Sequence, residues 1–407
     1  MDTPVRDIPS HVPMHLVYDY DTFTTPSQFE SPHWEVTKLL YEQAPPIFFT
    51  PRNGGHWVVT RSADIVEMYR HPEVFSSDPQ YNKLKRNNPT RHLPQFYDPP
   101  EHTDARKIMA PFFVPGAVQA MEPQIRQLAR ELIDAVYDRG SCEFVKDVAQ
   151  RYPVTIFLQM ANGPLSEREA LIDMAARYLQ SPDPAISQSG IRDLANFLSG
   201  LIEERRKALG DDLVSRIITG SFMGRPLTHD EVLGGAVFMF LAGLHTVIGM
   251  LSFVIMFLAR NPDHYKQLVD DPDRLTNAIE ELMRVSGVAM PERGVKDDTV
   301  YKGIQFRKYD RIVYLVPISG LDHAEIDQPF TVDFDRELSR HLVFGSGIHR
   351  CLGSHLARIE IRVFVEEWIA RIPAFSVKDG VTVQIRSGTN WEPLALPLVW
   401  RPESAKA

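Results

Sequence analysis

The apolar run at residues 232–259, VLGGAVFMFLAGLHTVIGMLSFVIMFLA, constrains the fold of this chain more than any other segment. A run of this length is long enough to cross a bilayer, and the same length and composition also suit the central helix of a large protein core. Thr228 and Glu231 stand at the spacing of a capping box just before the run. Arg260, Asn261 and Pro262 follow it, and a proline there ends a helix. The pattern therefore favours a long, buried central helix over a membrane span.

One face of this helix carries mostly small residues. Gly234, Gly235, Ala242 and Gly243 carry almost no side chain, which suits a flat group packed closely against the backbone. A single titratable residue, His245, lies in the same stretch beside Thr246.

The rest of the chain predicts a mainly α protein with small β-sheets. Residues 47–50 (IFFT) and 57–60 (WVVT) read as a hairpin around Asn53, Gly54 and Gly55. Residues 100–285 are mostly helical in pattern, strand signals return at 299–317 and 375–385, and a last helix is expected at 352–371. Without a linker or a repeat in the sequence, we expect one domain over residues 1–407.

Charge and cysteine content limit the partners and the compartment. The formal net charge of −9 argues against nucleic acid as a partner. The two cysteines, Cys142 and Cys351, lie far apart and form no disulfide framework. The N-terminus has no basic stretch followed by an apolar one, so we expect a cytoplasmic protein without a secretory signal.

The segment FGSGIHRCLG, residues 344–353, carries the strongest chemical signal. Gly345 and Gly347 free the backbone to bend, and Gly353 lets the following helix lie close to whatever Cys351 holds. A thiolate at a helix N-terminus is favoured by the helix dipole and by free N–H groups. A buried structural cysteine is the alternative, and four features at fixed spacing argue against it.

This loop resembles the haem-binding loop of the cytochrome P450 family, Phe-Gly-x-Gly-x-(His/Arg)-x-Cys-x-Gly, and the resemblance extends over nearly the whole chain. It implies the cytochrome P450 fold with a long central helix over the haem. It also implies haem b with Cys351 as the proximal thiolate ligand to the iron. Phe344 would pack beside the sulfur, and His349 would reach a haem propionate.

Further residues match the family at other positions. Glu281 and Arg284 have the Glu-x-x-Arg spacing of a structural ion pair on one helix face. Arg293 matches the propionate arginine of the family, and His102 and Arg106 match its His-x-x-x-Arg element. These three basic residues are expected to bind the propionates.

The segments ISGLDHAE, RIPAFSV and LALPLVW resemble the bacterial camphor-hydroxylase branch. That branch implies an enzyme outside the membrane, expected here as a monomer, that uses O2 and takes electrons from a small iron–sulfur ferredoxin served by a flavin reductase. A basic face for an acidic ferredoxin would draw on Arg106, Lys107, Arg340 and Arg350. Ordinary surface charge is the alternative for these four residues.

The central helix departs from the family pattern at one position. Ala242, Gly243 and Thr246 match Ala/Gly-Gly-x-(Asp/Glu)-Thr, which implies glycine against the porphyrin and the threonine hydroxyl beside bound dioxygen. His245 stands where the family has an acid, at the step that needs protons. It is read either as a replacement proton relay or as a core histidine satisfied by a neighbour. Asp173 is a candidate partner for it.

Alignment with the camphor branch also predicts a substrate pocket. It would be an apolar cavity with a few polar points, suited to a compact hydrophobic molecule with one oxygen, such as a terpenoid or an ionone-like norisoprenoid. The residues expected in its wall are Tyr81, Thr90, Phe238, Leu241, Val288, Ala289, Thr389 and Asn390.

The predicted activity is hydroxylation of such a molecule by a haem-thiolate monooxygenase. Two alternatives stay open. One is peroxide-driven use of the same haem, and the other is a haem-thiolate binding or sensing protein without turnover.

Overall fold

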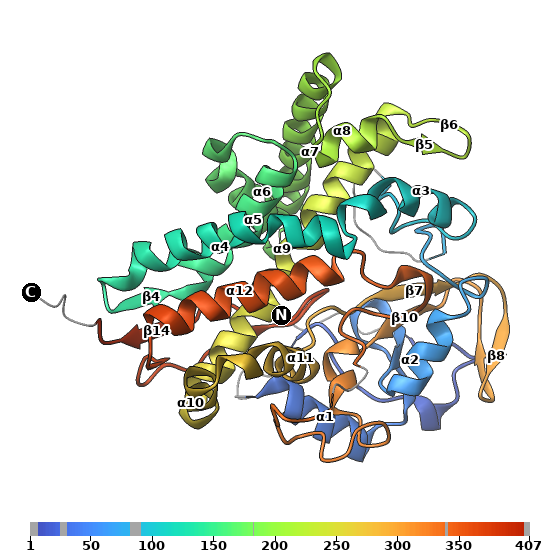
Figure 1. The fold of residues 1–407 in the computed structure, drawn as a ribbon. Coiled ribbons are helices and arrows are strands. Elements are labelled where there is room, and N and C mark those ends of the chain that lie inside the picture. Colours follow the sequence, from blue (N-terminus) through green and yellow to red (C-terminus); the bar gives the residue numbers. More distant parts are fainter. Residues whose placement is uncertain (1–6, 25–30, 82–90, 182, 338–340, 403–407) are drawn as a thin grey trace, which may run out of the picture.

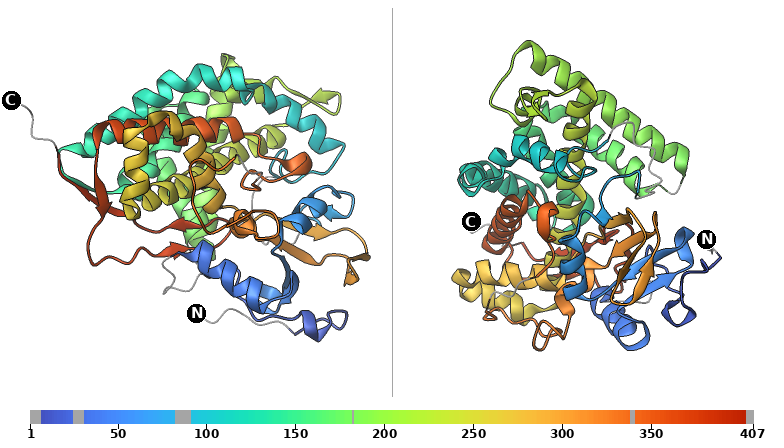
Figure 2. Two further views of the ribbon diagram at one scale, coloured as in Figure 1. Left: turned by 60° about the horizontal axis from the view of Figure 1, so that its bottom comes forward. Right: turned by 90° about the vertical axis from the view of Figure 1, so that its right-hand side faces the viewer.

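The computed structural model describes residues 7–24, 31–81, 91–181, 183–337 and 341–402. Helices dominate it, and they gather on one side of the molecule, while the N-terminal part and the largest sheet lie on the other (Figures 1 and 2). The helices are α1 Pro32–Gln43, α2 Ser62–Tyr69, α3 Glu101–Met109, α4 Pro115–Tyr137, α5 Arg151–Met160, α6 Arg168–Gln180, α7 Pro184–Lys207, α8 Leu213–Ile218, α9 His229–Arg260, α10 Pro262–Asp270, α11 Leu275–Val285 and α12 Ser354–Arg371.

Short strands form the small sheets that the sequence predicts. The largest sheet has the order β1-β2-β10-β7-β3. The strands are β1 Ile47–Thr50, β2 His56–Val59, β3 Phe75–Ser76, β4 Ser141–Glu143, β5 Ser221–Phe222, β6 Arg225–Pro226, β7 Glu292–Val295, β8 Thr299–Tyr301, β9 Ile304–Phe306, β10 Arg311–Tyr314, β11 Phe375–Val377, β12 Ile385–Arg386, β13 Glu392–Pro393 and β14 Pro397–Trp400. The predicted hairpin is confirmed: β1 pairs antiparallel with β2, and Asn53, Gly54 and Gly55 between them have positive φ.

The apolar run forms α9, which crosses the middle of the molecule (Figure 1). Thr228 Oγ1 accepts from the Glu231 N–H at 3.3 Å, and the Glu231 carboxylate accepts from the Thr228 N–H at 2.8 Å, so the predicted capping box is present. The helix stops before Pro262, as predicted. Within the described residues, α9 is the one helix long and apolar enough to cross a membrane, and 72% of its most apolar window is buried inside the protein. It is therefore a core helix of this fold.

The strand signals near 375–385 do not form one hairpin. β11 pairs with β14, whereas β12 pairs with β13 in a separate two-stranded ribbon. Residues 387–391 connect β12 to β13 and lie against the segment that leads into β7, because the Met290 N–H donates to Thr389 O and the Trp391 N–H donates to Val288 O, both at 2.8 Å. This placement brings a C-terminal ribbon to the side of α9.

Candidate active site

The cysteine loop is a tight turn in front of α12. The Cys351 N–H donates to Phe344 O at 2.7 Å, which closes the loop. Gly345 and Gly347 have φ of +67° and +63°. At Gly347 a Cβ would lie 2.7 Å from Tyr69 O, so both the conformation and the space there require glycine.

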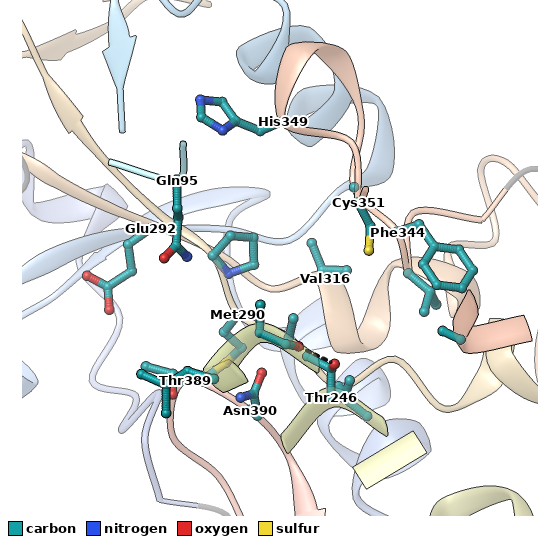
Figure 3. A pocket seen from close by; sticks show the side chains of 18 of the residues that line it. Gln95, Thr246, Met290, Glu292, Val316, Phe344, His349, Cys351, Thr389 and Asn390 are labelled. Carbon is teal, nitrogen blue, oxygen red and sulfur yellow. Dashed lines mark hydrogen bonds between the residues drawn. The ribbon is translucent and has the colours of Figure 1, made fainter. Parts of the chain in front are cut away.

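The Cys351 sulfur points into a cavity, toward the part of α9 that carries Thr246 (Figure 3). Burial raises the pKa of the Cys351 thiol, and a hydrogen bond from the Gly353 N–H, with the nearby guanidinium of Arg106, acts in the opposite direction. The N–H groups at the start of α12 thus stabilise charge on sulfur, as the sequence predicted.

The small residues of α9 differ in their surroundings, since a Cβ at Gly235 would lie 2.9 Å from the Met109 side chain. A Cβ at Gly243 would meet nothing within 4 Å, although this residue lies in the middle of a buried helix. Thr246 Oγ1 donates to Ala242 O at 2.8 Å, and both residues line the cavity (Figure 3). The space between Cys351 and α9 is therefore bounded by Ala242 and Thr246 on one side and by the thiol on the other, whereas Gly243 is exposed and is not one of the residues that line it.

Four basic groups meet beside this space, and no carboxylate of the described residues is bound to them. The rings of His102 and His349 lie with their centroids 4.1 Å apart. Burial, then Arg106 and Arg293, lower the pKa of His102 to about 4, and burial and the same arginines hold the pKa of His349 well below its usual value. Both ring nitrogens of His102 are buried and have no hydrogen-bond partner among the described residues.

The remaining contacts of this basic cluster are to neutral groups. Arg293 Nη1 donates to Glu292 O at 2.7 Å, and Arg106 Nη2 donates to Arg350 O at 2.6 Å. Ser77 Oγ and His349 Nε2 are 3.0 Å apart. A cluster of buried and partly buried cationic and imidazole groups is suited to anionic ligands such as two carboxylates.

Glu281 and Arg284 form the predicted buried ion pair on α11. Their two hydrogen bonds are each 2.7 Å, and the side chains are 3% and 0% exposed. Arg284 also donates to the carbonyl oxygens of Gly320, Pro329 and Thr331. This residue thereby ties α11 to the long segment that precedes the cysteine loop.

The cavity contains most of the predicted pocket residues. Phe238, Leu241, Val288, Ala289, Thr389 and Asn390 line it. Thr90 lies outside the described residues. Tyr81 does not line it: its ring stacks on Tyr309 with centroids 6.1 Å apart, at a separate polar surface cleft. This prediction was wrong because the ring of Tyr81 lies at that cleft instead, where Lys296 and Lys308 approach it.

Sequence reasoning missed several cavity residues. Gln95 and His92 contribute polar groups from the loop before α3, and Leu179, Val247, Met250 and Met290 add apolar surface (Figure 3 labels Gln95 and Met290). The loop residues have no periodicity that would assign them to a wall. Their position a few residues before the His102 element was the available signal.

The partner of His245 differs from the predicted one. Asp173 is 67% exposed on α6 and forms an ion pair with Arg177 at 2.8 Å. His245 is buried, and its Nδ1 lies 3.1 Å from Glu392 Oε2 of β13. The proposed Asp173 pairing is therefore incorrect, because α6 directs that side chain to solvent while the β12–β13 ribbon brings a carboxylate to α9.

These features together define a haem-thiolate protein, and the chain belongs to the cytochrome P450 family. The family model described as "Cytochrome P450" matches residues 157–385. The protein named "Probable cytochrome P450 127A1", of Sinorhizobium fredii, is 32% identical over 381 residues, which cover 92% of each chain. The chain is therefore a cytochrome P450 monooxygenase by class.

Within the family, the chain resembles the camphor-hydroxylase branch. The solved structure of CYP101C1 matches with a TM-score of 0.87 and 32% identity, covering 97% of this chain and 100% of that one. The structure of CYP101J2 matches with a TM-score of 0.88 and 29% identity, covering 97% and 99%.

Proteins of this family bind haem b, and the residues present fit that group. The small side chain of Ala242 borders the cavity on α9, Cys351 offers the sulfur ligand, and the nitrogens of His102, which have no hydrogen-bond partner among the described residues, lie in the basic cluster. When bound, haem supplies the oxygen chemistry, while the chain orients the substrate and manages protons.

Proposed function

We propose that this enzyme hydroxylates a small hydrophobic terpenoid or norisoprenoid, such as an ionone, using O2 and electrons from a small iron–sulfur ferredoxin served by a flavin reductase. The composition of the cavity wall supports the proposed class of substrate. It is mostly apolar, with Phe238, Leu241, Val288 and Met250 among its members. A compact hydrocarbon skeleton gains its affinity from such a wall.

A few polar groups in the same wall select for one oxygen on the substrate. Gln95, Thr389 and Asn390 line the cavity away from the cysteine loop (Figure 3). The amides of Gln95 and Asn390 can donate a hydrogen bond to a ketone oxygen. We expect this contact to orient the molecule so that one C–H bond faces the iron.

The proposed roles of the cofactor residues follow from their places around the cavity. Cys351 would bind the iron, with the Gly353 N–H holding the sulfur. His102, Arg106, Arg293 and His349 would hold the propionates. Phe344 and Gly345 line the cavity beside the sulfur, and the small side chain of Ala242 lies in its wall on α9.

The surface behind the cysteine loop supports a ferredoxin partner. Lys107 and Arg350 are exposed, and Arg106 is partly exposed between them. Arg340, which the sequence adds to this face, lies outside the described residues. A basic patch accelerates association with an acidic protein even when the total charge of the enzyme is negative. We further propose that the enzyme is a cytoplasmic monomer.

Product analysis tests the proposal. Purified protein is supplied with a ferredoxin, its reductase and a panel of terpenoid and norisoprenoid ketones, and product is counted per reducing equivalent. Hydroxylated product from one compact ketone, with coupling well above that of linear fatty acids, is the expected result. Turnover with peroxide but not with the electron chain would replace the proposal with the peroxide-driven alternative, and ligand binding without either turnover would replace it with a sensor.

A further inference from the structure

A buried imidazole–carboxylate–guanidinium chain joins α9 to the β12–β13 ribbon. His245 Nδ1 is 3.1 Å from Glu392 Oε2, and the side chains are 5% and 4% exposed. The other oxygen of Glu392 forms an ion pair with Arg386 of β12. One carboxylate thus bridges a guanidinium and a ring that stands next to Thr246 in the chain.

Arg386 keeps Glu392 ionised. A buried carboxylate without a cation would take up a proton, because an isolated charge is costly to bury. Burial lowers the pKa of Arg386 to about 10, so the guanidinium is still charged near neutral pH. An ionised carboxylate can only accept hydrogen bonds, and its second oxygen faces the imidazole.

The carboxylate therefore determines which nitrogen of His245 carries a proton. Nδ1 must be the donor to Glu392 whether the ring is neutral or cationic. Near neutral pH, the proton that can leave or return is then the one on Nε2, a buried atom. The same arrangement orients histidines in catalytic sites, where a carboxylate holds Nδ1–H and leaves Nε2 for proton transfer.

This chain of three residues lies next in sequence to residues that line the cavity. His245 precedes Thr246, whose side chain lines the cavity, and Glu392 follows two residues after Asn390, which lines it as well. α9 and the ribbon are in close contact, since a Cβ at Gly249 would lie 2.6 Å from Trp391 O. The ring of His245 is itself buried where these two elements meet.

We propose that Glu392, paired with Arg386, supplies to the central helix the carboxylate that its own sequence lacks. In this assignment Glu392 and Arg386 are positioning residues, and His245 Nε2 is the group that holds and delivers protons on the Thr246 side of the cavity. The inference goes beyond the monooxygenase activity itself, because it assigns a function to residues on the C-terminal ribbon that the haem-loop and helix motifs do not include.

Imidazole nitrogen spectroscopy tests the tautomer directly. The probe is holoenzyme labelled with 15N-histidine, kept diamagnetic as its ferrous carbon monoxide complex. The chain has 14 histidines, so the His245 signals are identified by their loss in His245→Gln. We expect the neutral His245 ring to carry its proton on Nδ1 in the wild type. In Glu392→Gln we expect the pKa of His245 to fall by about one unit or more, because the ring loses an adjacent negative charge.

Two controls separate this effect from a general disturbance. Asp173→Asn changes a carboxylate that contacts Arg177 on α6, so the His245 signals should not move. His33 reports on the ribbon itself, because its ring lies 5.0 Å from Trp391 and its Nε2 is 2.7 Å from Gly287 O. Burial lowers the pKa of His33 to about 4, so it stays neutral over the same range and should not titrate in any variant.

Turnover gives a second, independent readout. In Glu392→Gln we expect product per reducing equivalent to fall by roughly 10²-fold, the lower end of the usual contribution of a positioned acid–base group. The dissociation constant of the substrate, read from the haem spectrum, should change less than about threefold, since a loss of affinity would point to binding alone. If Glu392→Gln does not fold with Arg386 unpaired, the double variant Glu392→Gln/Arg386→Met removes both buried charges.

Two results would overturn the proposal. One is a neutral His245 with its proton on Nε2 in the wild type. The other is wild-type coupling in a folded Glu392→Gln or double variant. Either result would leave His245 as a structural core residue and would not affect the monooxygenase assignment, which rests on Cys351 and its loop.

Discussion

The centroids of the His102 and His349 rings lie 4.1 Å apart, within a basic cluster to which no carboxylate from the described part of the chain is bound. In the haem-free protein, burial and the nearby arginines disfavour the protonated form of both rings. The pKa of His102 falls from its usual 6.5 to about 4, first because it is buried and then because of Arg106 and Arg293. The consequence is a specific acid sensitivity that the propionates should remove.

Haem removal is the first prediction. Below pH 6.5 the unfolded chain protonates His102 while the native haem-free protein does not, so the free energy of unfolding falls as the pH falls from 6.5 toward 4. The slope from this residue approaches about 1.4 kcal/mol per pH unit. Haem-loaded protein should show a shallower slope in that window. Urea unfolding at pH 7.0, 6.0 and 5.0, with and without haem, measures the difference, and equal slopes would contradict a propionate site at His102.

Breaking the buried ion pair is the second prediction. Arg284→Met leaves Glu281 buried and bound to fewer donors, and we expect a loss of about 3–5 kcal/mol in the free energy of unfolding. Lys266→Met is the matched control, because Lys266 and Asp270 form an exposed ion pair of similar type. Its loss should stay below about 1 kcal/mol. A small loss at Arg284 would mean that Arg336, which also contacts Glu281, is sufficient.

Replacing the loop glycine is the third prediction. Gly347→Ala adds a methyl group where a Cβ would lie 2.7 Å from Tyr69 O, at a φ of +63°. Gly54→Ala has the same kind of backbone conformation, with nothing within 4 Å of the Cβ. We expect Gly54→Ala to cost about 1–2 kcal/mol from conformation alone, and Gly347→Ala to cost more and to lower the haem bound per chain. Equal unfolding free energies and full haem content would show that the loop can shift.

The fourth prediction concerns substrate affinity. Gln95→Leu removes a polar group from the cavity wall, so affinity for a ketone should fall by roughly 2–12-fold, the equivalent of one hydrogen bond of about 0.5–1.5 kcal/mol. Affinity for the parent hydrocarbon should be unchanged or better. Tyr81→Phe, outside the cavity, should change neither. Dissociation constants from the haem spectrum give the answer, and a parallel loss for both ligands would assign Gln95 to packing.

The fifth prediction concerns electron delivery. Lys107→Glu and Arg350→Glu reverse charges on the face behind the cysteine loop, where Lys107 is 72% exposed. We expect slower association with an acidic ferredoxin and a weaker dependence of the rate on salt. Lys308→Glu, on the far hairpin segment beside Asp297, is the control for net charge. Stopped-flow reduction at several ionic strengths compares the three variants. If the reduction rate fell equally in all of them, the effect would come from total charge and not from this face.

The haem side of the site was predictable because its residues stand close together in the chain or on one helix. Cys351, Gly345, Gly347 and Phe344 belong to one loop, and the capping box and Pro262 give the bounds of α9. Glu281 and Arg284 are one helical turn apart, so their contact follows from the helix itself.

The partner of His245 could not be predicted in the same way. Glu392 lies 147 residues away in the chain, on a two-residue strand without a clear pattern of its own. Backbone hydrogen bonds of Thr389 and Trp391 hold this segment against residues 288–290, and such bonds leave no mark on side-chain composition. Tyr81 failed for a related reason, since the direction of a loop depends on tertiary contacts such as the ring of Tyr309. That residues 1–407 form one domain stays a prediction.

The segment from Thr389 to Glu392 has a consequence for directed evolution of this enzyme. Its first two residues line the cavity, and its last residue contacts the imidazole of His245, the residue before Thr246. Libraries that vary positions 389 and 390 to accept new molecules will therefore also disturb the spacing between carboxylate and ring. Variants at these positions that accept new substrates should therefore form less product per reducing equivalent. Changes at other cavity residues, such as Gln95 or Leu179, should alter the substrate range without this loss.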